Sequence, residues 1–93
     1  MMTLEKLRKE IEGLNSEIIA LLAKRRRLTL KIAEIKRKEN LPIFDPIRES
    51  DQRKVIEEVA RKSGLDPKTV FSLFDDFIAY CKQEMEHHWE SSR

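Results

Sequence analysis

A cation interrupts the most regular apolar pattern in the sequence. Leucine and isoleucine recur at alternating steps of three and four residues between positions 4 and 35, as in the heptad seam of a long amphipathic helix. That spacing predicts an apolar side chain between Leu21 and Leu28, but the chain has Arg25 there. A cation at a seam position loses hydration unless an anion meets it. Arg25 therefore pairs with a buried glutamate, extends out to solvent, or binds an anionic ligand.

Two further cations have spacings compatible with that of Arg25. Lys36 follows it by eleven residues, about three helical turns, so both project from nearly the same side, about 16 Å apart along the axis. Long side chains at this spacing are able to bind the opposite ends of one small polyanion. Arg48 falls on the same stripe of a second predicted helix as Gln52. The alternative for Arg48 is a pair within its own helix, with Asp51 or Gln52.

A fourth cation, Arg8, lies too far along the first helix to share a small ligand with Lys36 within one chain. It precedes Arg25 by seventeen residues, roughly 25 Å of helix. Two copies of the helix that cross antiparallel near residue 19 would bring Arg8 of one copy opposite residue 30 of the other, midway between Arg25 and Lys36. Two-fold symmetry then predicts two equivalent composite sites in a homodimer.

Other kinds of catalytic site are not evident in the sequence. It contains no Ser/His/Asp set, no metal-ligand cluster, no glycine-rich phosphate loop and no Cys/His pair. His87 and His88 lie near the C-terminal end, where they are expected as exposed helix-end cations. A set of cations without a nucleophile indicates anion binding, or a reaction that needs only positioning and electrostatics. We therefore expect neither a metal nor another cofactor.

A single long helix is predicted to carry three of these four cations. It is expected over about residues 3–40, with Thr3 as its N-cap and no proline before Pro42. Gly13 costs this helix roughly 1 kcal/mol relative to alanine, which the rest of the pattern outweighs. At 1.5 Å per residue, a helix of about 36 residues is roughly 54 Å long.

Two shorter helices complete the predicted all-α fold. Each begins with an aspartate N-cap followed by proline, which predicts helices over about residues 46–62 and 67–90. The segment Ser63-Gly64 ends the first of them. The inner face of the last helix is expected to consist of Val70, Phe74, Phe77, Ile78, Cys81, Met85 and Trp89. The whole chain, residues 1–93, is therefore expected to be one domain of three helices.

The relative lengths of the helices predict association between two copies of the chain. Helices of about 24 and 35 Å cannot cover a helix of about 54 Å by folding back on it. A chain of 93 residues also gains only marginal stability from burying its own apolar surface. We therefore expect the first helix to pair with its copy in an intertwined homodimer.

Composition narrows the class of protein further. The chain is 39% charged and 40% hydrophobic, and nineteen Lys and Arg against seventeen Asp and Glu give a net charge of +2. This balance gives no reason to expect a nucleic-acid or membrane partner. The N-terminal residues contain no long apolar run for a signal peptide or a membrane span. The single cysteine, Cys81, cannot form an intrachain disulfide, so a cytoplasmic location is expected.

Short motifs over nearly the whole chain resemble those of the all-helical chorismate mutases, the AroQ class. The stretch LRKEIEGLNSEIIALLAKRRRLTLKIAEIK, followed by LPIFDPIRE, carries the resemblance. It is similar to the family's Leu-Arg-x-x-Ile start, Leu-Leu-x-x-Arg core, Ile-x-x-x-Lys end and Pro-x-x-Asp-x-x-Arg-Glu second-helix opening. The resemblance implies an isomerase of the shikimate pathway, in aromatic amino acid biosynthesis, that converts chorismate to prephenate. That reaction is a unimolecular Claisen rearrangement without a covalent enzyme intermediate.

The resemblance also implies a role for each of the four cations. The arginine that matches Arg8 reaches across the dimer and, with Arg25, clamps the substrate carboxylates, while Arg48 assists. Lys36 matches the lysine that donates to the ether oxygen as the C–O bond breaks, a contact worth roughly 3 kcal/mol of transition-state stabilisation.

Four further positions are implied to contact the substrate. Asp45 and Glu49 match residues on its hydroxyl side, and Glu49 would fix the ring hydroxyl. On the third helix, Cys81 takes a position that is often serine or asparagine. Met85 takes the position of a polar donor, commonly glutamine, that faces the ether oxygen, although methionine cannot donate a hydrogen bond.

The missing donor leaves three alternatives open. Gln83 or Glu84 substitutes for it through a shifted third helix, the enzyme is weaker, or its substrate differs.

Two other functions remain open. Isochorismate-pyruvate lyases share the fold, the arginine clamp and the lysine, and Tyr80 and Trp89 distantly resemble that branch. A non-catalytic helical dimer, acting as a regulatory or partner-binding module, would instead use the heptads only for association. A plain coiled coil has no reason to retain buried cations, which favours an enzyme.

Overall fold

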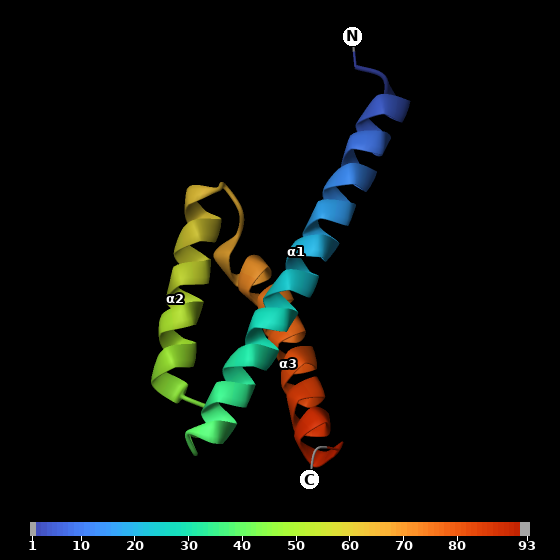
Figure 1. Cartoon of the computed structure of the whole chain (residues 1–93). Helices are drawn as coiled ribbons and strands as arrows, with labels where there is room; N and C mark the ends of the chain where they lie inside the picture. The colour runs from blue at the N-terminus through green and yellow to red at the C-terminus, as the bar shows by residue number, and fades with distance from the viewer. Residues whose placement is uncertain (1, 92–93) are drawn as a thin grey trace.

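Three helices make up the fold. The structure, a computed structural model, describes the backbone of residues 2–91 and the side chains of residues 2–87. The helices are α1 (Leu4–Lys38), α2 (Pro46–Lys62) and α3 (Pro67–Ser91), and the described residues contain no strand (Figure 1). The predicted all-α fold is thus confirmed. None of the helices in this part of the chain is long and apolar enough to cross a membrane.

The two aspartate–proline signals start α2 and α3 through side-chain caps. Asp45 Oδ1 accepts hydrogen bonds from the backbone N–H groups of Ile47 and Arg48, at 3.1 and 3.2 Å. Asp66 Oδ2 accepts from the hydroxyl and the N–H of Thr69, at 2.7 and 3.0 Å. These two hydrogen bonds lower the pKa of the Asp66 carboxyl. Each cap satisfies N–H groups that have no partner within the helix.

A side-chain cap starts α1, and residues suited to a left-handed backbone follow α1 and α2. Thr3 Oγ1 accepts from the Lys6 N–H at 3.2 Å, so Thr3 caps the start of α1. Beyond the end of α1, Asn40 has a φ of 55°, and beyond the end of α2, Gly64 has a φ of 77°. Asparagine and glycine tolerate this conformation best.

The helices are arranged so that α3 packs against both α1 and α2. Figure 1 shows α2 and α3 beside the C-terminal half of α1, while the N-terminal half of α1 extends beyond them. The molecule is accordingly elongated, with principal extents of 58, 28 and 16 Å. The contacts that α1 makes with the other described helices therefore lie along its C-terminal half.

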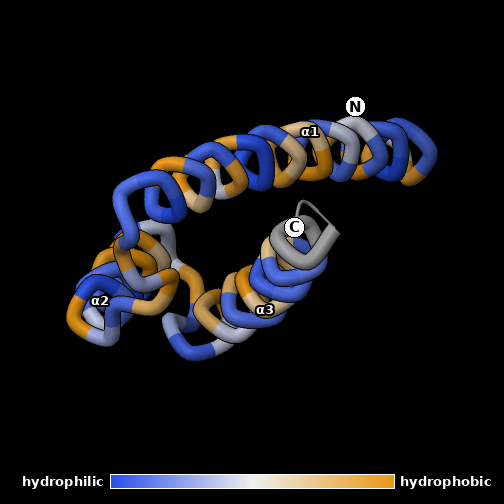
Figure 2. The backbone as a smooth tube through the Cα atoms, turned by 60° about the horizontal axis from the view of Figure 1, so that its bottom comes forward, coloured by the Kyte–Doolittle hydropathy of each residue, from blue (hydrophilic) through white to orange (hydrophobic). Residues whose placement is uncertain are grey.

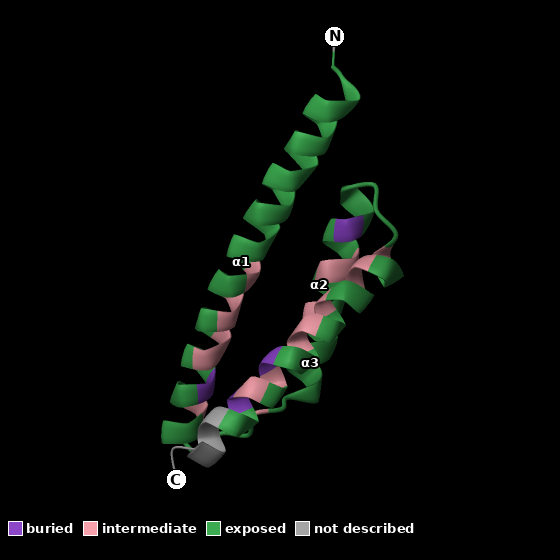
Figure 3. Cartoon of the chain, turned by 90° about the vertical axis from the view of Figure 1, so that its right-hand side faces the viewer, coloured by how far each residue is buried: buried purple, intermediate pink, exposed green. Residues whose placement is uncertain are grey.

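The hydrophobic core is small, and three of its four described residues lie in or beside that half of α1. Among the described side chains only four are buried, Ala33, Ala60, Cys81 and Met85. Figure 3 shows the buried positions on α1 and α3 near the C-terminal end of α1, and a further one near the end of α2. Small or flexible side chains at these positions let the helices approach closely.

The apolar seam along the N-terminal half of α1 has no partner within the described chain. Exposed side chains of this seam are Leu4, Leu7, Ile11, Leu14, Ile18 and Leu21. Apolar positions recur along α1 over its whole length (Figure 2), and Figure 3 shows this half as exposed throughout. A continuous apolar stripe of this length marks an interaction surface. The homodimer that was expected from the helix lengths stays a prediction.

Candidate functional site

A cleft lies between the three helices, beside the C-terminal half of α1. Its lining comes from α1, the linker before α2, the first turns of α2 and the second half of α3. The residues are Arg25, Thr29, Ile32, Ala33, Lys36, Ile43, Asp45, Arg48, Glu49, Gln52, Ile78, Cys81, Lys82 and Met85. The cavity holds about 150 Å³. Pockets for drug-sized ligands hold roughly 300–1,000 Å³, so this cleft suits a small molecule.

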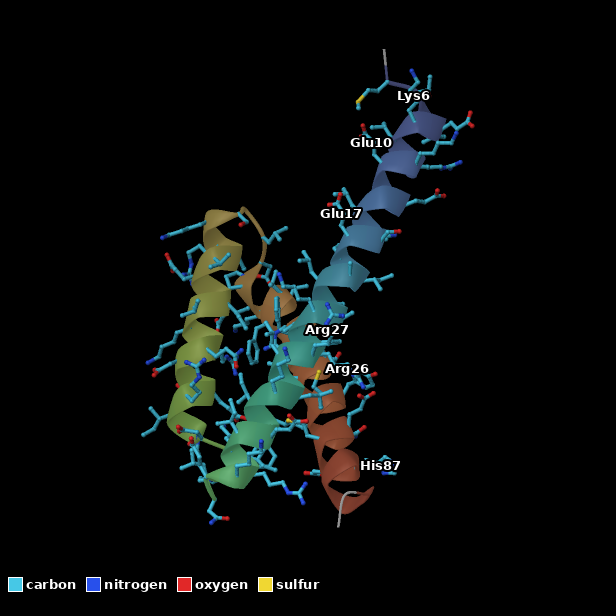
Figure 4. The ribbon with its side chains drawn as sticks, in the orientation of Figure 1. Lys6, Glu10, Glu17, Arg26, Arg27 and His87 are labelled. Atoms are coloured by element: carbon cyan, nitrogen blue, oxygen red, sulfur yellow. The ribbon has the colours of Figure 1, made fainter. Side chains whose placement is uncertain are left out.

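The cleft brings together seven of the eight residues that the sequence suggested for the site. These are Arg25, Lys36, Asp45, Arg48, Glu49, Cys81 and Met85. The eighth, Arg8, is exposed on the N-terminal half of α1, outside the cleft. The part of α1 that extends beyond α2 and α3 also carries Lys6, Glu10 and Glu17 (Figure 4). Residues from three separate stretches of sequence thus meet, and one remains apart.

Arg25 is half-buried at the edge of the cleft and has no carboxylate partner among residues 2–87. Its guanidinium carbon lies 5.9 Å from the centroid of the Phe74 ring, at the outer limit of a cation–π contact. One turn later, the hydroxyl of Thr29 donates to the Arg25 carbonyl at 3.0 Å. The glutamate-paired alternative is therefore absent here, and Arg25 keeps its charge available to the cleft.

Lys36 lies at the last turn of α1 and is half-buried. Its Nζ donates to the backbone carbonyl of Ile43, in the linker before α2, at 3.1 Å. An ammonium has three donors, so this bond fixes the position of the side chain and leaves donors for another group. The linker thus holds the cation at one end of the cleft.

Arg48 and Asp45 meet at the first turn of α2. Arg48 is exposed, and no ion pair joins it to Asp51 within the part of the chain whose side chains are described. One oxygen of Asp45, Oδ1, is occupied by the helix cap. The second oxygen remains free to accept from a ligand, so Asp45 combines a structural role with a place in the cleft.

Glu49 is paired with a lysine that the sequence reasoning missed. Lys82 Nζ, from α3, donates to Glu49 Oε1 at 2.6 Å and lies 4.5 Å from the centroid of the Phe44 ring. The side chains of Lys82 and Glu49 keep 29% and 47% of their exposure. One sequence signal was available, because Lys82 directly follows Cys81 and precedes Met85 by three residues, which puts it at the border of the inner face.

The α3 wall of the cleft is apolar where it is deepest. Cys81 is 1% exposed and Met85 is 6% exposed. Burial raises the pKa of the Cys81 thiol, although Arg25 acts in the opposite direction. The thiol is therefore neutral at neutral pH. Trp89, which was also expected on this face, and His88 lie outside the described side chains.

Gln83 and Glu84, which the sequence offered as substitutes for a donor at position 85, do not line the cleft. Glu84 forms an ion pair with Arg26, which lies where α1 passes α3 (Figure 4). Hydrogen bonds from Tyr80 and from Arg26 lower the pKa of the Glu84 carboxyl, and the bond to Glu84 raises the pKa of Tyr80. Gln83 and Glu84 line a separate surface depression with His87, so both are outside the cleft.

The electrostatic balance of the cleft is positive. Among the described side chains that line it, four are cationic and two are carboxylates, which leaves a charge of +2. The cations are Arg25, Lys36, Arg48 and Lys82, and the carboxylates are Asp45 and Glu49. Cations around a small, partly apolar cavity favour an anion of matching charge. Arg25 and Arg48 also offer planar donor forks that fit carboxylates.

The structure defines an all-helical protein with a cleft lined mainly by cations. Comparison with known families is more specific. Residues 7–86 match the family described as chorismate mutase type II, and the chain belongs to that family. The family resemblance found in the sequence motifs is thereby confirmed.

Individual relatives differ greatly in length. The chain is 46% identical over 87 residues to a bifunctional chorismate mutase/prephenate dehydratase of Aquifex aeolicus, covering 87% of this chain but 23% of that protein. It is 32% identical over 78 residues to the T-protein of Haemophilus influenzae, covering 84% and 21%. A chorismate mutase of Methanocaldococcus jannaschii is 28% identical over 90 residues, covering 97% and 91%. The chain thus spans under a quarter of the first two relatives.

Proposed function

We propose that this chain is a chorismate mutase, an isomerase that rearranges chorismate to prephenate on the route to phenylalanine and tyrosine. The positive balance of the cleft lining is the observation that carries the proposal. Substrate and product are dicarboxylates, so a site with a charge of +2 complements either of them. The rearrangement is unimolecular, with an ether C–O bond breaking as a C–C bond forms. It therefore needs positioning and electrostatic stabilisation but no nucleophile.

Three cations of the cleft have distinct tasks in this proposal. Arg25 and Arg48 hold the substrate carboxylates through charge-assisted hydrogen bonds and keep the enolpyruvyl arm above the ring. Lys36 donates to the ether oxygen, where negative charge gathers as the bond breaks. The hydrogen bond from Lys36 to the Ile43 carbonyl supports this assignment, because a fixed ammonium does not have to reorganise during the reaction.

The acidic and apolar residues of the cleft orient the remainder of the substrate. Glu49 accepts a hydrogen bond from the ring hydroxyl, and Asp45 lies on the same side. Cys81 and Met85 exclude water from the wall that faces the breaking bond. Their burial supports this role, because a wall that keeps water out strengthens the electrostatic interactions of the cations with the substrate.

The active unit in this proposal is a homodimer in which Arg8 completes the partner's site. The exposed apolar seam of the N-terminal half of α1 supports the dimer, because a second copy of that seam covers it. The same pairing would carry Arg8 from the far end of α1 to the cleft of the other copy. Without it, the carboxylate clamp lacks one of its arginines.

The cytoplasm is the compartment that fits this proposal. Cys81 is a free and buried cysteine. Free thiols persist in the reducing cytoplasm, whereas exported proteins usually pair their cysteines.

Replacement of Lys36 tests the proposed function most directly. The purified chain is expected to convert chorismate to prephenate, and Lys36→Ala to lower kcat about a hundredfold, because it removes the donor to the ether oxygen. Lys38→Ala is the matched control, since Lys38 lies on the same last turn of α1 but outside the cleft. A parent chain that leaves chorismate unchanged, or that releases pyruvate from isochorismate, would refute the proposal.

A further inference from the structure

Lys82 is the one cation that the described part of α3 contributes to the cleft. The family-derived assignment of site residues does not include it, and the neighbouring polar residues of α3, Gln83 and Glu84, line a different depression. Lys82 lies at the rim of the cleft, with its side chain 29% exposed. Its ammonium is therefore close to the substrate site without being buried among apolar residues.

Two contacts fix the ammonium of Lys82. Its Nζ lies 2.6 Å from Glu49 Oε1 and 4.5 Å from the centroid of the Phe44 ring. A cation held by a carboxylate and an aromatic face has little freedom to swing into solvent. The pair occupies only one oxygen of Glu49, and no other described side chain binds Oε2. Lys82 thus holds the carboxylate in one orientation and leaves the second oxygen free to accept a hydrogen bond from a hydroxyl.

The charge of Glu49 creates a difficulty for a site that binds a dianion. A carboxylate placed against a dicarboxylate substrate repels it, and the repulsion is strong in a small cavity with apolar walls. The ammonium of Lys82 pairs directly with Glu49 and so offsets the negative charge of that carboxylate. Without Lys82, the charge of the described cleft lining falls from +2 to +1.

We propose that Lys82 is a positioning residue for substrate binding: it orients the Glu49 carboxylate and neutralises its charge, so that a dianionic substrate with a ring hydroxyl binds beside it. The proposal rests on the proposed mutase function. Lys82 acts through Glu49 and does not touch the reacting atoms, so its contribution appears in binding rather than in the chemical step.

A contribution to folding is a different role, and the geometry limits it. The ion pair between Lys82 and Glu49 is partly exposed on both sides. Exposed ion pairs add little to stability, because side-chain entropy and solvent screening offset their attraction. Loss of Lys82 should therefore leave the melting temperature close to that of the parent. Arg61, whose guanidinium pairs with Glu58 at 2.5 Å on α2, provides a matched pair away from the cleft.

Steady-state kinetics with chorismate tests the proposal through a double-mutant cycle. Lys82→Gln is expected to raise KM about tenfold with kcat changed less than about twofold, and Lys82→Arg to restore KM to near the parent value. In a Glu49→Gln background, Lys82→Gln should change KM by less than about twofold, because the charge that Lys82 neutralises is gone. The control Arg61→Gln should leave KM and kcat at the parent values.

The outcomes separate this proposal from the proposed function. If the parent is active but Lys82→Gln leaves KM unchanged, the positioning role of Lys82 is wrong and the mutase function stands. If Lys82→Gln raises KM equally in the Glu49→Gln background, Lys82 does not act through Glu49 and the proposal also fails. A parent without mutase activity overturns the proposed function, and the role of Lys82 with it.

Discussion

Mixing two inactive variants tests whether each site is shared between two chains. Arg8 and Arg25 are separated by seventeen residues of the continuous helix α1, about 25 Å along its axis. Side chains of one chain do not bridge that distance to reach one small ligand. A site that contains both Arg8 and Lys36 must therefore draw them from different chains.

The expected magnitude follows from two-fold symmetry. Arg8→Ala removes a charge-assisted carboxylate contact and Lys36→Ala removes the ether donor, and each loss is expected to lower kcat/KM about a hundredfold. In a heterodimer of the two variants, one site contains both substitutions and the other contains neither. Random pairing of equal amounts of the two variants gives about half heterodimers. Each heterodimer has one intact site of its two, so the mixture should recover about a quarter of the parent activity.

The assay is prephenate formation after the two variants are unfolded together, refolded and shown by mass spectrometry to contain heterodimers. The same treatment of each variant alone provides the baseline. A mixture that contains heterodimers but stays at that baseline would show that Arg8 does not serve the partner's site. Full activity of a monomeric parent, or of Arg8→Ala alone, would refute the shared site altogether.

Two further predictions concern Met85, in the α3 wall of the cleft, and its neighbour Glu84, outside the cleft. Met85→Gln should raise kcat at least about tenfold, because it places an amide donor where methionine has none; unchanged kcat for a folded variant would mean that no donor is missing. Glu84→Gln should flatten the pH dependence of stability, measured by thermal unfolding. The pKa of Glu84 is lowered by Tyr80 and Arg26, so its ionised form stabilises the fold above the ordinary glutamate range. That contribution is lost as the pH falls below about 4.3, and equal slopes for parent and variant would contradict this reasoning.

Sequence alone determined where the helices of this fold begin and that two of its cations share one side of α1. Side-chain caps at Thr3, Asp45 and Asp66 are local interactions within a few residues, so the sequence predicts where each helix begins. The placement of Arg25 and Lys36 on one side of α1 follows from helical periodicity. Both features depend only on short-range geometry, and neither needs knowledge of what packs against the helix.

Tertiary structure decided which residues at the border of the inner face of α3 reach the cleft. Successive residues on a helix point about 100° apart, so Lys82, Glu84 and Met85 cannot all face one neighbour. Close packing of Cys81 and Met85 selects the rotation of α3, which turns Glu84 toward Arg26 and brings Lys82 to Glu49. Pairs 33 and 58 residues apart in sequence depend on this rotation. Periodicity predicts a stripe, but only packing decides which residues at its border join the site.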